Sequence, residues 1–170
     1  KTFKDYISVM EQFLAGMKGI KEGGFFNWLY GVKPYFVLEL ALANVGEETT
    51  FYAAVPANKA RFFEKQFQGI FPDGQIEIKY EDYNIFNPEG ESRASWMALE
   101  KNPIFPLKTY QKLESDPLEI IATAFSKLKK EGEGAALQII LSPDESGFLN
   151  KIKNSIEKLK KGEKLEKSGI

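Results

Sequence analysis

Strand-like and helix-like stretches follow one another between residues 49 and 141 in an order that few folds share. Two stretches, residues 57–68 and 117–130, carry apolar residues at every third or fourth position, and each predicts a helix. Four stretches have the pattern of strands: residues 49–55, 75–80, 93–101 and 135–141. The resulting order, β-α-β-β-α-β, is that of the split βαβ arrangement. The sequence therefore predicts an α+β, ferredoxin-like fold, with two helices on one face of an antiparallel sheet.

Three further elements are predicted around this unit. Residues 35–43 alternate like a strand and would extend the sheet through a hairpin with residues 49–55. A helix is predicted at each end of the chain, over residues 3–20 and from residue 145 to about residue 161. We accordingly expect three parts: an N-terminal helix and aromatic segment (1–33), a ferredoxin-like domain (34–143), and a lysine-rich helix or linker (144–170).

The helix predicted at residues 117–130 has the clearest start signal in the chain. Asp116 can cap it, and Pro117 suits the first helical position. Gly132 can take a left-handed conformation just after its end. The predicted buried stripe consists of Leu118, Ile121, Ala122, Phe125 and Leu128.

Missing residue types exclude several kinds of chemistry. The 170 residues include no Cys and no His, which rules out disulfides, a thiolate nucleophile, a Ser-His-Asp triad and nearly all zinc sites. The phosphate-binding pattern G-x-x-x-x-G-K-[ST] is also absent. We therefore expect no enzymatic activity, no ATP hydrolysis by this chain, and neither a cofactor nor a metal. A net charge of -1 argues against binding of duplex nucleic acid through bulk charge.

The chain is expected to be a piece of a longer protein, because it begins at Lys1 rather than Met. No signal-peptide pattern is visible. The most apolar stretch, residues 34–43, is too short to span a bilayer. We therefore expect a soluble chain without a membrane span of its own.

Two segments are candidates for a contact surface with another protein. The first is the N-terminal helix, whose apolar residues would dock on the core, pack against another domain or lie on a membrane surface. Its polar face is not rich in Lys and Arg, which argues against the membrane surface. The second is residues 25–30, where four aromatic residues fall within six positions and would either pack under the sheet or form an exposed patch for a partner. The candidate interaction residues are Phe3, Tyr6, Met10, Phe13, Met17, Phe25, Phe26, Trp28 and Tyr30.

Single-stranded nucleic acid is an alternative partner. Ferredoxin-like sheets can stack bases on aromatic side chains, and Tyr35 and Tyr52 could form such a pair. The lysine-rich C-terminal region, residues 151–167, could contact phosphates, although such helices are usually solvated. Glu39, a carboxylate within an apolar strand, is expected at an edge or facing outward.

Short motifs distributed over roughly two-thirds of the chain point to a known family. They are Pro34-Tyr35-Phe36-Val37-Leu38-Glu39, Thr50-Phe51-Tyr52-Ala53-Ala54-Val55-Pro56, Glu81-Asp82-Tyr83, Leu107-Lys108-Thr109-Tyr110, Asp116-Pro117-Leu118, Ala124-Phe125-Ser126-Lys127-Leu128 and Gly132-Glu133-Gly134-Ala135-Ala136-Leu137-Gln138-Ile139. With these motifs, residues 34–143 resemble the N-terminal region of conjugation-type (type IV secretion) ATPases and their HerA/FtsK-like relatives, in the forms found in candidate-phylum bacteria.

The resemblance implies a pre-ATPase domain, located between membrane helices and a RecA-like motor in a longer protein. No position here matches the motor's nucleotide-binding motifs, so no catalytic residue is carried over. The implied role is non-catalytic docking, in the cytoplasm at the inner face of the membrane. The implied partners are the motor, other subunits of a secretion or translocation complex, or another copy of the chain. The alternatives are a free-standing module that binds single-stranded nucleic acid and a small enzyme that uses carboxylates.

Overall fold

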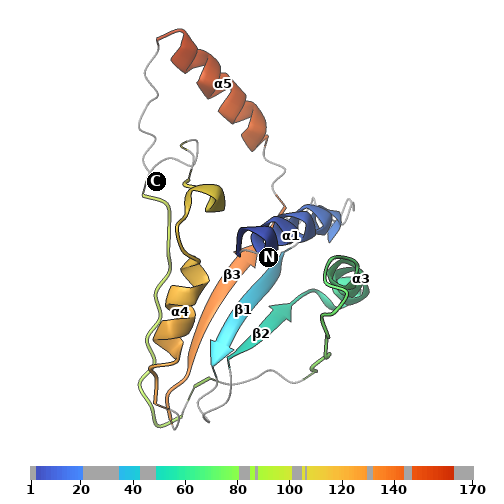
Figure 1. Cartoon of the computed structure of the whole chain (residues 1–170), viewed down its shortest axis with the longest axis vertical. Helices are drawn as coiled ribbons and strands as arrows, with labels where there is room; N and C mark the ends of the chain where they lie inside the picture. The colour runs from blue at the N-terminus through green and yellow to red at the C-terminus, as the bar shows by residue number, and fades with distance from the viewer. Residues whose placement is uncertain are drawn as a thin grey trace. The chain divides into compact units, whose positions relative to one another are not determined.

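The computed structural model of the chain contains short strands and helices joined by irregular segments (Figure 1). The structure describes residues 3–20, 35–42, 49–80, 85–86, 88–100, 105, 107–129, 132–143 and 147–162. Its elements in chain order, with η for a 3₁₀ helix, are α1 (Phe3–Gly16), η1 (Met17–Ile20), β1 (Phe36–Leu42), β2 (Thr50–Ala54), η2 (Ala57–Lys59), α3 (Ala60–Ile70), η3 (Tyr110–Lys112), α4 (Pro117–Phe125), β3 (Ala135–Leu141) and α5 (Phe148–Lys160). They divide into two compact units, residues 1–92 with 113–143, and residues 93–112 with 144–170.

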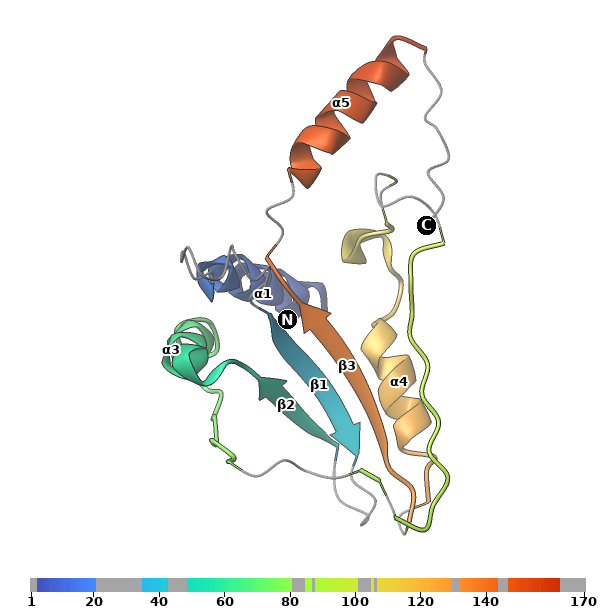
Figure 2. The ribbon, with the colours of Figure 1, turned by 180° about the vertical axis from the view of Figure 1, so that it is seen from behind.

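Three antiparallel strands form one sheet in the order β2-β1-β3 (Figure 2). Leu38 of the central strand lies opposite Ile139 on β3, and Leu40 lies opposite Phe51 on β2. Because directly opposite side chains share a face of a sheet, these four line one face, and Glu39 points to the other. The predicted hairpin of the first two strands is confirmed, with β1 inside the sheet instead of at its margin.

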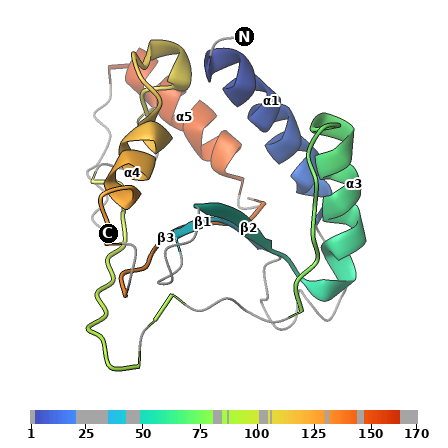
Figure 3. The same ribbon diagram turned by 60° about the horizontal axis from the view of Figure 1, so that its bottom comes forward.

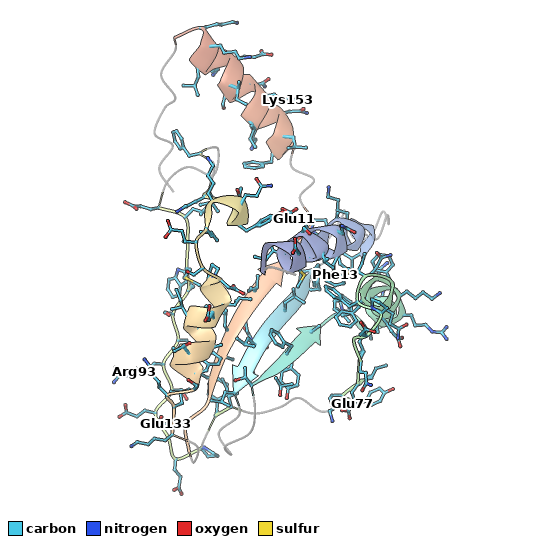
Figure 4. The ribbon with its side chains drawn as sticks, in the orientation of Figure 1. Glu11, Phe13, Glu77, Arg93, Glu133 and Lys153 are labelled. Atoms are coloured by element: carbon cyan, nitrogen blue, oxygen red, sulfur yellow. The ribbon has the colours of Figure 1, made fainter. Side chains whose placement is uncertain are left out.

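The hydrophobic core forms where α1, η1 and α3 pack against the beginning of β1. Phe13, Met17, Ile20, Phe36 and Phe63 are buried together there. The ring of Phe13 (labelled in Figure 4) lies 5.5 Å from that of Phe63 and 6.5 Å from that of Phe36, edge-on in both cases. Figure 3 shows α1 and α3 side by side on the same side of the sheet. The N-terminal helix is therefore part of the core of its unit.

Two glycines allow the N-terminal helices to approach α3 closely. A Cβ atom on Gly19 would lie 2.9 Å from the ring of Phe62, and one on Gly16 would collide with the side-chain amide of Gln66. Protein interiors are too densely packed to absorb such an overlap without movement. A larger residue at either position would push the two segments apart unless the facing side chain moved.

Helix α4 begins at its predicted cap. The Leu118 amide donates a hydrogen bond to Asp116 Oδ1 at 2.9 Å, and Pro117 occupies the first turn. The helix ends at Phe125, earlier than the predicted residue 130, and Gly132 has a left-handed φ of 84° as predicted. Phe125 is buried as predicted, whereas Leu118 is exposed. The cap is thus confirmed, and the predicted buried stripe is only partly confirmed.

Two of the predicted strands are not strands. Residues 75–80 and 93–100 have no strand partner in the part of the chain that is described. Their side chains are exposed, those of Tyr80 and Trp96 almost completely. An alternating pattern becomes a strand only where it pairs with a sheet that buries its apolar face, and these segments find no such sheet. The α+β class and the antiparallel sheet are confirmed, but these two strand predictions, which the ferredoxin-like order requires, are wrong.

The C-terminal helix α5 forms within its predicted range. It starts after Gly147, which has a left-handed φ of 68°, and it ends at Lys160. Across the described residues, no helix combines the length and the apolar character needed to cross a bilayer.

Candidate functional site

The structure separates the candidate contact residues of the N-terminal helix. Phe13 and Met17 are each only 1% exposed and belong to the core, so the prediction that they form an exposed contact surface is wrong. The reason is that α3 and β1 of the same chain already cover this side of the helix. Met10 remains 36% exposed. The side chains of the other candidates lie outside those that the structure describes: Phe3, Tyr6, Phe25, Phe26, Trp28 and Tyr30.

Strand β2 is an edge of the sheet that carries no charge. Among the described residues it has a strand partner on one side only, and its sequence TFYAA contains no charged residue and no proline. Natural edge strands usually carry a lysine, a proline or a bulge, which discourages pairing with other chains. Phe51 is 77% exposed, although Leu40 opposite it is buried. The strand thus presents a large apolar side chain at an edge of the sheet.

Strand β3 forms the opposite edge of the sheet among the described residues. Its sequence, AALQIIL, is uncharged as well, and Ile139 and Ile140 are exposed. What distinguishes β2 is the greater exposure of a single large side chain, that of Phe51.

Three polar side chains form a row across the second face of the sheet. Tyr52, Glu39 and Gln138 lie opposite one another on β2, β1 and β3. Gln138 Nε2 donates a hydrogen bond to Glu39 Oε2 at 3.1 Å. Glu39 is 9% exposed, and its other carboxylate oxygen, Oε1, has no hydrogen-bond partner among the described residues. The expectation that Glu39 lies at an edge or faces outward is wrong, because its strand is the central one.

The chemistry available to this row is limited. It offers one carboxylate, one amide and one phenol. In the described parts of the chain, no three Asp, Glu, His or Cys side chains gather as metal ligands. By strand alternation Tyr35 belongs to the same face, but it lies four residues from Glu39, about 13 Å along the sheet. Tyr35 and Tyr52 are therefore not a neighbouring pair on which two bases could stack.

An exposed ion pair lies in the segment that follows α3. Lys79 Nζ donates a hydrogen bond to Glu77 Oε1 at 2.6 Å. This hydrogen bond and the charge of Glu77 raise the pKa of Lys79, and Tyr52 adds a smaller contribution. Both side chains are well exposed, so the pair contributes little to stability.

The lysines of α5 are exposed. Within residues 148–162, Lys151, Lys153, Lys158, Lys160 and Lys161 all face solvent, and Figure 4 shows the labelled Lys153 projecting from the helix. This part of the predicted lysine-rich region is therefore available to an anionic partner.

Comparison of the chain with models of protein families, with curated proteins and with solved structures finds no match.

Proposed function

We propose that this chain is a non-catalytic assembly domain that docks to a second copy of itself through strand β2. The observation that supports the proposal most directly is the uncharged edge strand, with Phe51 exposed in its middle. Two copies of β2 running antiparallel would each complete the edge of the other, because a twofold interface uses the same patch twice. Strand addition of this kind takes its affinity from main-chain hydrogen bonds and its specificity from side chains such as Phe51.

The resemblance of residues 34–143 to the pre-ATPase region of conjugation-type ATPases extends this proposal. In that setting the chain is the docking domain of a membrane-linked conjugation or secretion ATPase. It acts in the cytoplasm at the inner face of the membrane, where docking between copies would hold neighbouring subunits together.

The test is the oligomeric state of the chain and of edge variants, measured by sedimentation velocity over a range of concentrations. We expect the parent chain to self-associate and Phe51→Lys to raise the dissociation constant by at least about tenfold, because a lysine on an edge strand opposes pairing. Ala53→Lys on the same strand should act in the same direction. The matched control is Ile120→Lys, which places the same charge at an exposed apolar position of α4 and should leave self-association unchanged.

Two results would contradict the assembly role. One is a parent chain that stays monomeric at every concentration, and the other is an equal effect of Phe51→Lys and Ile120→Lys. The alternative function, binding of single-stranded nucleic acid, is checked by titrating an oligonucleotide at about 50 and 200 mM salt. A monomer that binds the oligonucleotide tightly, and loses it at the higher salt concentration, would favour that alternative.

A further inference from the structure

Helix α5 has an apolar side that is partly open to solvent. Phe148 and Ile152 are half-buried, whereas Leu149, Ile156 and Leu159 are exposed, Leu149 by 72%. At 3.6 residues per turn all five positions fall within one continuous stripe along the helix. The helix therefore carries an apolar stripe of which one border is uncovered.

The charges of α5 are arranged around this stripe in a definite pattern. The helical spacing places Lys153 and Lys160 next to the border formed by Leu149 and Ile156. Lys151 and Lys158 lie towards the opposite border of the stripe, by the same spacing. The middle of the polar side holds Asn150, Asn154, Glu157 and Lys161. With five lysines and one glutamate between residues 148 and 161, the helix is strongly basic.

We propose that α5 binds in the plane of an anionic lipid surface, with its apolar stripe in the boundary between headgroups and acyl chains. A basic amphipathic helix with Phe and Leu on its apolar side is the pattern of interfacial membrane helices. Lysines at the border of the stripe can bury their methylene chains along the apolar surface while their ammonium groups reach lipid phosphates. The exposed border of the stripe and its flanking lysines lie on the same side of the helix, so both contacts can be made at once.

The dimensions of α5 fit a helix that lies on the bilayer and does not cross it. Its 13 residues span about 20 Å, shorter than the roughly 30 Å hydrocarbon layer of a bilayer. Binding of this kind depends on buried apolar area and on attraction to anionic lipids together. This inference is independent of the proposed docking through β2, since that strand belongs to the other compact unit.

The first experiment is flotation of the full chain with vesicles of phosphatidylcholine alone and of phosphatidylcholine with phosphatidylglycerol. We expect binding to the anionic vesicles only, weakened as rising salt shortens the screening length. Replacing Lys153 and Lys160 by Gln should reduce partitioning by about 30-fold, since each basic residue near an anionic surface contributes about a factor of five. The matched control, Lys127→Gln with Lys129→Gln, removes the same charge from exposed positions after α4 and should have a much smaller effect.

The second experiment separates insertion of the apolar stripe from adsorption by charge alone. In the Leu149→Trp variant, tryptophan emission should shift to shorter wavelength when anionic vesicles are added, after subtraction of the parent chain's own signal. Absence of binding to anionic vesicles would overturn the proposal. An equal loss of vesicle binding in the α5 lysine variant and in the control variant of Lys127 and Lys129 would overturn it as well. So would vesicle binding of the Leu149→Trp variant without a shift in its tryptophan emission.

Discussion

At the scale of single residues, Phe13 is one of the most deeply buried side chains of the core. Its ring makes edge-on contacts with Phe36, Phe63 and Phe67 at centroid distances of 6.5, 5.5 and 6.3 Å. Such pairs add to the free energy already gained by burying the ring. We therefore expect Phe13→Ala to lower the free energy of unfolding by about 3–5 kcal/mol, measured by chemical denaturation. The exposed Phe51 is the matched control, and Phe51→Ala should change stability by less than about 0.5 kcal/mol.

Burial of Glu39 is expected to lower the stability of the fold, whereas burial of Phe13 raises it. One of its carboxylate oxygens is buried without a partner among the described residues. Replacing it by methionine, which has a similar shape and no polar oxygen, should raise the free energy of unfolding by about 1 kcal/mol. Gln138→Ala is the comparison: it removes the hydrogen bond to Glu39 Oε2 while keeping the buried carboxylate, so it should lower the free energy of unfolding by about 1–3 kcal/mol. A Glu39→Met variant less stable than the parent would mean that the carboxylate has a stabilising partner elsewhere in the chain.

At the scale of elements, the start of α4 depends on one side chain. Asp116 accepts the hydrogen bond of an amide that the first turn would otherwise leave without a partner. Asp116→Ala should lower the free energy of unfolding by about 1 kcal/mol, whereas Asp116→Asn should retain most of the stability, because asparagine caps about as well. The denaturant midpoints of the parent chain, Asp116→Ala and Asp116→Asn test this prediction. If the alanine variant matched the parent, packing of α4 and not its cap would hold the start of this helix.

At the scale of the whole molecule, the two proposed surfaces belong to different compact units. The β2 edge lies in the unit that contains the sheet and the aromatic core, and α5 lies in the other unit. Phe51→Lys and the paired lysine variant of α5 therefore alter separate parts of the chain. Because all the altered side chains are exposed, both variants should keep the fold of the parent chain. The β2 variant can therefore serve as a control in the vesicle-binding experiment, and the α5 variant as a control in the self-association experiment.

Signals that act over a few neighbouring residues were sufficient to predict much of this protein. The Asp116 cap, the left-handed Gly132, the strand at residues 135–141 and the hairpin of the first two strands all follow from local hydrogen bonding or strict alternation. The uncharged sequence of β2 was visible as well. Its position at the edge of the sheet was not, because that depends on which other segments pair with it.

Only the tertiary structure determines which segments with an alternating or helical apolar pattern pack against another part of the chain. Residues 75–80 alternate as clearly as β2 but remain exposed, since no described strand pairs with them. The stripe containing Phe13 could have faced another protein, and it is buried because α3, distant in sequence, packs against it. Glu39 became a buried carboxylate because β3, nearly a hundred residues later, completes the sheet beside it. Periodicity is a property of neighbouring residues, whereas burial and pairing depend on contacts between residues far apart in the chain, and no local pattern encodes them.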